Sequence, residues 1–345
     1  MNRVFFGDCR DTMRDLIAQG VKVQMCVTSP PYFGLRDYGH AGQLGLEATP
    51  AEFVAAMVEV FGLVRELLAD DGVLWLNLGD SYANDAKWGG STGGKHVQAL
   101  HGDSGIGRGK KTTGMRPKNL LGIPWRVALA LQEDGWNLRQ DIIWHKPNPM
   151  PESVTDRCTK AHEYLFLLSK SERYYWDAEA MREQAAPASL KRWAQNVEDQ
   201  TGSDRVPGKT NGNMKAVGGP RSKRDSFKRE DSKRAEVIPG QTVGTHQPDR
   251  DEGEWDTATR NRRSVWTVPT VPYSGAHFAT FPPALIEPCI LAGSRSGDTV
   301  LDCFFGSGTT GEVAGNLGRN WIGCEINDQY APLQRARTAQ HGLAL

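Results

Sequence analysis

The sequence lacks several features that define common classes of protein. Its 345 residues carry 41 Lys and Arg against 41 Asp and Glu, so there is no excess of charge of either sign. A surface for nucleic acid must therefore come from local segregation of charge. No apolar run approaches the roughly 18 residues of a membrane span, and the N-terminus lacks a signal-peptide pattern. These absences predict a soluble, cytoplasmic protein that is not held in a membrane.

The six cysteines also lack a pattern that would give them a shared role. None of them forms a CxxC pair, and most lie in apolar, strand-like segments. Closely spaced Cys pairs are typical of zinc sites and of redox-active motifs. We therefore expect buried, reduced thiols and no metal site.

What the sequence does contain is an alternation of short apolar runs and amphipathic segments. This alternation is typical of a mostly parallel, doubly wound α/β sheet, and the length allows one large domain or two modest ones. Strands are predicted over 4–6, 22–28, 73–78, 138–144, 163–168, 299–304 and 320–324. Helices are predicted over 50–69, 120–134, 282–292, 310–317 and 328–340, with a further helix after Asp8.

Two stretches depart from this alternation and are rich in positive charge. Residues 84–118 hold seven Lys and Arg against two acids, and residues 205–234 hold ten against three. The second lies within 187–262, where the regular pattern fades. Each stretch fits either a solvated, disordered segment or a surface that contacts a polyanion.

A rigid polar shelf follows the predicted strand 22–28. Ser29, Pro30, Pro31 and Tyr32 come directly after the strand, and the two prolines end any ladder because neither has a backbone N–H. In open α/β sheets, ligands bind at the carboxyl ends of strands. The segment is either half of a binding site or a simple strand-to-loop turn with a packed Tyr.

A second motif occurs about 270 positions later, in a predicted β-α-β unit. Gly306 and Gly308 allow a tight turn and close approach of a ligand, and the following helix offers free N–H groups. Glu325, 19 positions after Gly306, ends the next strand and is placed to bind ribose hydroxyls. The motif comprises Asp302, Phe304, Gly306, Ser307, Gly308, Thr309 and Glu325. Taken alone, the turn is also compatible with a purely structural role, although a binding role is favoured.

Together the two motifs resemble those of amino-group DNA methyltransferases that use S-adenosylmethionine. The order, with the Ser-Pro-Pro-Tyr motif before the cofactor motif, is similar to that of the β-class of this family. The resemblance implies a Rossmann-like methyltransferase fold with a seven-stranded, circularly permuted sheet, in which strand 4–6 follows the C-terminal helix. It divides the chain into a catalytic half (1–186), an inserted target-recognition region (187–262) and a cofactor-binding half (263–345).

The same resemblance assigns roles to individual residues. Asp8 would accept a hydrogen bond from the adenine amino group, although it also suits the N-cap of the following helix. Phe278, Thr280 and Phe281 would pack on the methionine part of S-adenosylmethionine. Trp144 and Lys146 resemble part of the target-base pocket, with a plain core role favoured for Trp144.

The residue at position 29 bears on the target base. Cytosine-N4 enzymes of this family typically have Ser at this position, whereas adenine-N6 enzymes usually have Asp. The expected reaction is therefore N4-cytosine methylation of flipped-out double-stranded DNA, with adenine-N6 as the alternative. Cytosine-C5 methylation needs a nucleophilic Cys, and the single Pro-Cys pair, at Cys289, suits a helix core.

An alternative of another class is a non-catalytic DNA-binding protein on a Rossmann-like scaffold. The resemblance further implies a bacterial or phage source, and leaves open a homodimer and a companion restriction endonuclease.

Overall fold

The computed structural model describes residues 2–35, 40, 42–83, 114–193, 259–270 and 281–339. The chain divides into two compact units, one formed by 1–181 with 263–345 and the other by 182–262. Within the second unit, β6 (Arg182–Gln184) pairs antiparallel with β7 (Thr259–Asn261), and α5 spans Pro187–Trp193. Most of both basic stretches lies outside the described residues, so their interpretation stays a prediction, as does the three-part division of the chain.

The larger unit is built on an eight-stranded sheet in the order β1-β10-β9-β2-β3-β5-β4-β8. Its strands are β1 (Arg3–Phe6), β2 (Val23–Thr28), β3 (Leu68–Leu78), β4 (Asn137–His145), β5 (His162–Ser169), β8 (Val265–Thr267), β9 (Thr299–Asp302) and β10 (Asn320–Glu325). β5 runs antiparallel to β3 and β4, and the other pairings are parallel. The seven predicted strands are all present, and the three-residue β8 adds an eighth at the edge.

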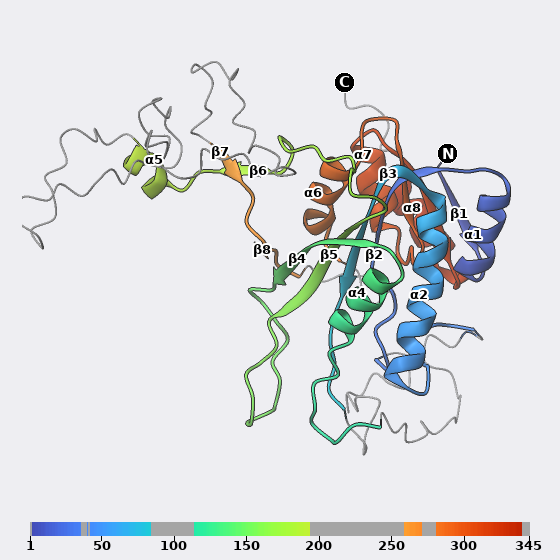
Figure 1. Ribbon diagram of the computed structural model, residues 1–345, viewed down its shortest axis with the longest axis horizontal. Coiled ribbons are helices and arrows are strands. Elements are labelled where there is room, and N and C mark those ends of the chain that lie inside the picture. The colour runs from blue at the N-terminus through green and yellow to red at the C-terminus, as the bar shows by residue number, and fades with distance from the viewer. Residues whose placement is uncertain are drawn as a thin grey trace, which may run out of the picture. The chain divides into compact units, whose positions relative to one another are not determined.

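The pairing of β1 with β10 gives the sheet its permuted order. Phe6 lies opposite Glu325 in the register, and the Gly7 amide donates to the Glu325 carbonyl at 2.9 Å. The first strand of the chain therefore occupies the place of a strand that would follow the last helix, as predicted (Figure 1). This placement brings Asp8 to the edge of the sheet at which Glu325 ends.

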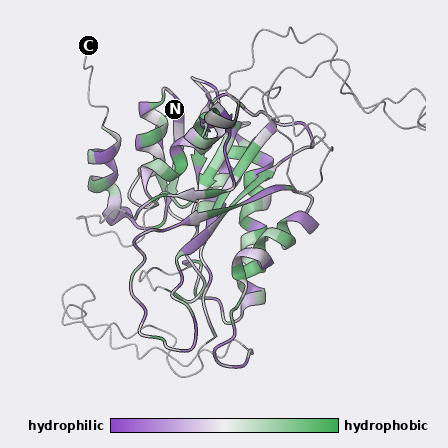
Figure 2. Ribbon diagram, turned by 90° about the vertical axis from the view of Figure 1, so that its left-hand side faces the viewer, coloured by the Kyte–Doolittle hydropathy of each residue, from purple (hydrophilic) through white to green (hydrophobic). Residues whose placement is uncertain are grey.

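Helices cover both faces of the sheet, as a doubly wound fold requires. α1 (Cys9–Ala18), α2 (Pro50–Leu67) and α4 (Ile123–Glu133) pack on one face. α6 (Pro283–Gly293) and α7 (Thr309–Asn316) pack on the other, and α8 (Ala331–Thr338) follows the short 3-10 helix Asp328–Tyr330 and packs on α7. Hydrophobic colouring concentrates on the strands and the adjoining helices (Figure 2). None of the helices in the described ranges has the length and apolar character of a membrane span.

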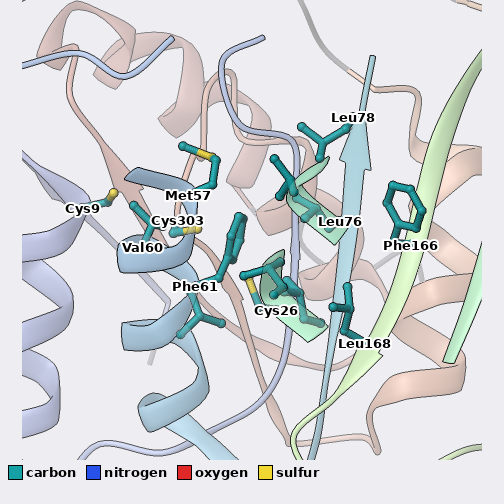
Figure 3. Packing of buried hydrophobic residues seen from close by; sticks show 14 of the residues in the cluster. Cys9, Cys26, Met57, Val60, Phe61, Leu76, Leu78, Phe166, Leu168 and Cys303 are labelled. Carbon is teal, nitrogen blue, oxygen red and sulfur yellow. The ribbon is translucent and has the colours of Figure 1, made fainter. Parts of the chain in front are cut away.

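Alternation along the strands divides the core into two layers. Cys26 and Leu76 lie in one layer with Met57 and Phe61 of α2, and Phe166 belongs to the same layer, with its ring against Trp125 of α4 (Figure 3). Their strand neighbours point to the opposite layer, under α6 and α7. Each fully buried large apolar side chain contributes about 1.5–3 kcal/mol of transfer free energy. The two layers hold the central strands firmly, so the loops at their carboxyl ends start from fixed positions.

Element boundaries differ from the predicted ones where local backbone geometry intervenes. α4 begins at Ile123 because Gly122 adopts a left-handed φ of 69° as its N-cap. β3 starts at Leu68, immediately after α2, and so is longer than the apolar run that predicted it. The last predicted helix is divided into a 3-10 turn and α8.

Candidate active site

The two sequence motifs line one cavity of about 880 Å³ at the edge of the sheet. β2 and β9 are neighbouring parallel strands, so their carboxyl ends deliver both loops to the same place. The cavity is lined by Ser29, Pro30, Pro31 and Tyr32 from the first motif and by Asp302, Phe304, Gly306, Ser307, Thr309 and Glu325 from the second. Asp8 and Phe281 line it as well. Phe278 and Thr280 lie outside the described residues.

Asp302 connects the two motifs directly. Its Oδ1 accepts a hydrogen bond from Thr28 Oγ1 at 2.5 Å and one from the Phe304 amide at 3.0 Å, while its Oδ2 accepts from Thr310 Oγ1 at 2.6 Å. Complete burial raises the pKa of Asp302 to about 6, against the opposing effect of these three donors. Thr28 immediately precedes Ser29, so this carboxylate fixes the start of the shelf relative to the turn after β9.

Glu325 holds the Gly-rich turn against β10. Its Oε2 accepts from the Gly306 amide at 2.7 Å, and its Oε1 accepts from the Asn327 amide at 2.9 Å. Burial raises the pKa of Glu325 to about 7, against the opposing effect of these backbone donors. Each carboxylate oxygen can accept more than one hydrogen bond. Glu325 can therefore brace the turn and still accept hydrogen bonds from a ligand in the cavity.

Side chains of α8 form hydrogen bonds with the Gly-rich turn. Arg337 Nη1 donates to Ser307 Oγ at 2.8 Å, and Gln334 Nε2 donates to the Gly306 carbonyl at 2.7 Å. Gly308, the N-cap of α7, has a φ of +89°, and a Cβ there would lie 3.5 Å from the Gln334 Cα. Glycine is favoured at this position by the left-handed backbone, since the distance to α8 is an ordinary contact, while Gly306, Ser307 and Thr309 face the cavity.

Asp8 has a structural partner that the sequence analysis did not anticipate. It caps α1 by accepting from the Arg10 amide at 2.8 Å, and it forms an ion pair with the Arg10 guanidinium at 2.6 Å. Hydrogen bonding from Arg10 lowers the pKa of Asp8. The N-cap role is therefore present, and the ionised side chain also borders the cavity.

The Tyr32 ring is held at two ends. Its hydroxyl donates to Glu163 Oε2 at 2.6 Å and lies 3.2 Å from Asn77 Oδ1. At the ring itself, a Cβ built on Gly79 would fall 2.4 Å from Tyr32 Cε2, so glycine allows the segment directly after β3 to lie this close to the ring. Lys146 Nζ forms an ion pair with Glu163. The position of the ring is thus set by Asn77 of β3, Glu163 of β5 and the close approach of Gly79, and Lys146 holds Glu163 in place.

Trp144 combines the two roles considered for it. It is buried, its indole N–H donates to the Val268 carbonyl at 2.8 Å, and it also lines the cavity. The ammonium of Lys146 lies 4.2 Å from the centre of its ring, in a cation–π contact. Trp144 is therefore a core residue with one surface turned to the site.

The sequence analysis did not identify several polar residues of the cavity, among them Asn77, Asp80, Lys160 and Glu163. Asn77 is a polar residue within an apolar strand, and Asp80 follows the end of that strand. Both positions are typical of site residues and could have identified these two side chains from the sequence. Glu163 opens β5, and only the antiparallel direction of β5 brings its first residues to the same edge as the carboxyl ends of the parallel strands. Burial lowers the pKa of Lys160.

The donor set suits a nucleoside that carries a cationic group. Glu325 ends β10 where vicinal ribose hydroxyls are bound in such folds, and the turn before α7 presents backbone N–H groups. Among the carboxylates that border the cavity, those of Asp8, Asp302 and Glu325 belong to the predicted cofactor site and favour a positively charged ligand such as a sulfonium. Asp8, the turn 304–309 and Glu325 would hold S-adenosylmethionine.

Comparison with known proteins agrees with this site. The family model described as DNA methylase, of the N6/N4 group, matches residues 23–335. The chain is 40% identical to the type II methyltransferase M.SmaI of Serratia marcescens, over 97% of this chain and 90% of that protein. It is 39% identical to M.Cfr9I of Citrobacter freundii, over 96% of this chain and 85% of that protein.

Solved structures share the fold at low identity. The PvuII DNA methyltransferase (cytosine-N4-specific) is 16% identical with a TM-score of 0.56, over 99% of this chain and 88% of that one. The Thermus thermophilus protein TTHA0409, complexed with S-adenosylmethionine, is 19% identical with a TM-score of 0.53, over 99% and 96%. The chain therefore belongs to the N6/N4 family of DNA methyltransferases, and its cofactor is S-adenosylmethionine.

Proposed function

We propose that the protein methylates the exocyclic N4 amino group of cytosine in duplex DNA, with the target base flipped into the cavity. The observation that carries this proposal is Ser29, which lines the cavity beside the cofactor turn and stands where adenine-N6 relatives usually have Asp. The PvuII enzyme, named as cytosine-N4-specific, shares the fold and supports the choice, although at 16% identity it establishes the fold alone.

The Ser-Pro-Pro-Tyr shelf supplies what this reaction needs. An exocyclic amine is a weak nucleophile because its lone pair is delocalised into the ring. The Ser29 hydroxyl and the Pro30 carbonyl accept hydrogen bonds from the two amino hydrogens, which favours a more tetrahedral nitrogen aligned for attack. S-adenosylmethionine, when bound, supplies the electrophilic methyl group. Tyr32 stacks on the flipped base.

Asp302 is an anchor in this mechanism and does not act as the base that takes the amino proton. Three donors already occupy its oxygens, and its side chain is buried. Asp302 therefore holds Thr28, and through it Ser29, at a fixed place beside the methyl donor. A rate contribution from such positioning is expected because small displacements of reacting atoms are costly.

Mass spectrometry of nucleosides from methylated DNA tests the target base. DNA from cells that express the protein should contain N4-methylcytosine, and sequencing of modified bases should report the recognition sequence. N6-methyladenine without N4-methylcytosine would overturn the assignment in favour of the adenine alternative. Methylation at C5 is not expected, because Cys289 is fully buried in α6 and its thiol donates to the Leu285 carbonyl.

Replacement of Tyr32 tests the stacking role. Tyr32→Ala should reduce turnover at least tenfold while the affinity for S-adenosylmethionine changes little, because the ring belongs to the base pocket. Tyr32→Phe is the matched control, since it keeps the ring and loses only the hydrogen bonds to Glu163 and Asn77. Equal losses of turnover and cofactor affinity in Tyr32→Ala would argue against stacking.

Crosslinking to the cofactor distinguishes a methyltransferase from the alternative function, a non-catalytic DNA-binding protein. Ultraviolet light should attach labelled S-adenosylmethionine to the wild-type chain, and the absence of labelling would favour the binder. Double-stranded DNA is the proposed partner. A homodimer and a companion restriction endonuclease remain predictions, which gel filtration and a cleavage assay on unmethylated DNA would test.

A further inference from the structure

One apolar side chain at the cavity stands out by its exposure. Met150 is 84% exposed, more than any other large hydrophobic residue in the part of the chain that the structure describes. It nevertheless lines the cavity that contains Ser29 and Asp302. Leu35, three residues after Tyr32, also lines the cavity and is 52% exposed. The cavity lining is therefore largely apolar, with the polar groups of the site set among apolar side chains.

The turn that carries Met150 is rigid and anchored. Pro149 and Pro151 flank the residue and restrict the backbone on both sides. Asn148 is fixed by two hydrogen bonds, from its Nδ2 to the Thr270 carbonyl and from the Thr270 amide to its Oδ1, both at 3.0 Å. The constrained backbone therefore keeps the Met150 thioether exposed to solvent.

Hydrogen bonds also fix both ends of the connection between β4 and β5, to which Met150 belongs. The Lys146 amide donates to the Ala161 carbonyl at 2.8 Å, which closes the connection between β4 and β5. Lys160 Nζ donates to the Asp80 carbonyl at 2.9 Å, beside the cavity. Lys118 forms an exposed ion pair with Asp156 at 2.6 Å. These contacts fix the connection that carries Met150, and an exposed apolar tip held in a defined position suits contact with the base faces of a nucleic acid.

We propose, on the basis of the proposed function, that Met150 enters the duplex beside the target nucleotide and occupies the space that the flipped base leaves. Flipping costs a few kcal/mol of pairing and stacking, and apolar side chains placed between base steps are a known way to offset that cost. Methionine is unbranched and polarisable, so it packs against bases of any identity. Met150 is a positioning residue in this role, because it acts on the duplex and does not contact the reacting atoms.

Paired and unpaired substrates test this role. Methyl transfer by wild type and by Met150→Ala would be measured on a duplex with the mapped recognition sequence, and on the same duplex with an abasic site opposite the target base. The variant should lose at least tenfold in kcat/KM on the paired duplex and stay within about twofold of wild type on the abasic one. Met150→Leu should retain activity on both.

Leu129→Ala is the matched control, because Leu129 is 48% exposed on α4 and does not line the cavity. It should leave both rates unchanged. Equal losses by Met150→Ala on the two substrates, or no loss on either, would overturn the role of Met150. If wild type methylates neither substrate, the proposed function itself fails. Fluorescence of 2-aminopurine at the target position gives a second readout, which should rise on binding of wild type and less on binding of Met150→Ala.

Discussion

Thr28 and Asp302 are 274 positions apart, yet their side chains meet within the core at 2.5 Å. From the sequence, Ser29 is the decisive residue of the first motif, and Asp302 is a residue of the second. The structure connects the two motifs directly, because Thr28, which precedes Ser29, donates a hydrogen bond to Asp302. The sequence identifies Ser29 and Asp302 as site residues, but it does not indicate that Asp302 would accept a hydrogen bond from Thr28 and so fix the position of Ser29.

Replacement of Thr28 tests this connection. Thr28→Val keeps the shape and removes the donor, so turnover should fall about tenfold while affinity for S-adenosylmethionine changes little. The lost donor helps to keep the pKa of Asp302 down at about 6, and its removal should raise that pKa. Because ionised Asp302 still accepts from the Phe304 amide and the Thr310 hydroxyl at the cofactor turn, the acid limb of the rate profile should move to higher pH with this pKa. Thr28→Ser, which restores the hydroxyl, should recover both properties; an unshifted profile in Thr28→Val would contradict the role.

Glu325 predicts a pH dependence of stability in the cofactor-free protein. Burial raises its pKa to about 7, above the unfolded value of about 4.3. Between these values the folded state binds more protons than the unfolded state, so this residue lowers stability as pH rises through the window and its full penalty applies above pH 7. Glu325→Gln lacks this titration. Its Tm relative to wild type should increase from pH 5 to pH 8.

Differential scanning fluorimetry across that range measures the effect. Asp328→Asn is the control, because Asp328 is exposed three residues further on and should show a flat difference. A flat difference for Glu325→Gln would contradict the buried-charge interpretation. The variant should also bind S-adenosylmethionine about tenfold more weakly, since the proposed ribose ligand is altered.

At the scale of the elements, sequence periodicity is sufficient to predict the doubly wound sheet and the placement of both motifs at the carboxyl ends of its parallel strands. The apolar runs identified the central strands, and the two turns followed from prolines and glycines. Periodicity does not report strand direction, so Glu163 at the start of the antiparallel β5 was missed. It also does not report side-chain pairing, and the Arg10 partner of Asp8 was missed for that reason.

Two helix caps differ in whether they also face the cavity. Thr49 caps α2 in a capping box with Glu52. Asp80, two residues after β3, accepts from the Gly122 and Ile123 amides at the start of α4 at 3.1 and 3.0 Å, and it lines the cavity. Loss of either cap should lower the free energy of unfolding by about 1 kcal/mol.

Only the loss of Asp80 should also reduce turnover. Thr49→Ala and Asp80→Ala would be compared by urea unfolding and by methyl transfer well below the unfolding transition. Thr49→Ala is expected to keep full turnover, and Asp80→Ala to lose tenfold or more. If both variants keep wild-type turnover, Asp80 serves α4 alone.

At the scale of the whole molecule, a net charge of zero requires that DNA attraction be local. The basic stretch 205–234 lies outside the described residues and keeps its role as a sequence-based prediction. Replacing Lys223, Arg224, Lys228 and Arg229 by Glu should weaken DNA binding and reduce its salt dependence. If all four contact phosphates, the slope of log K against log salt should fall in magnitude by about 4. Exchanging Lys for Arg and Arg for Lys at the same positions keeps the charge and should keep the slope. An unchanged slope after charge reversal would place the DNA surface elsewhere.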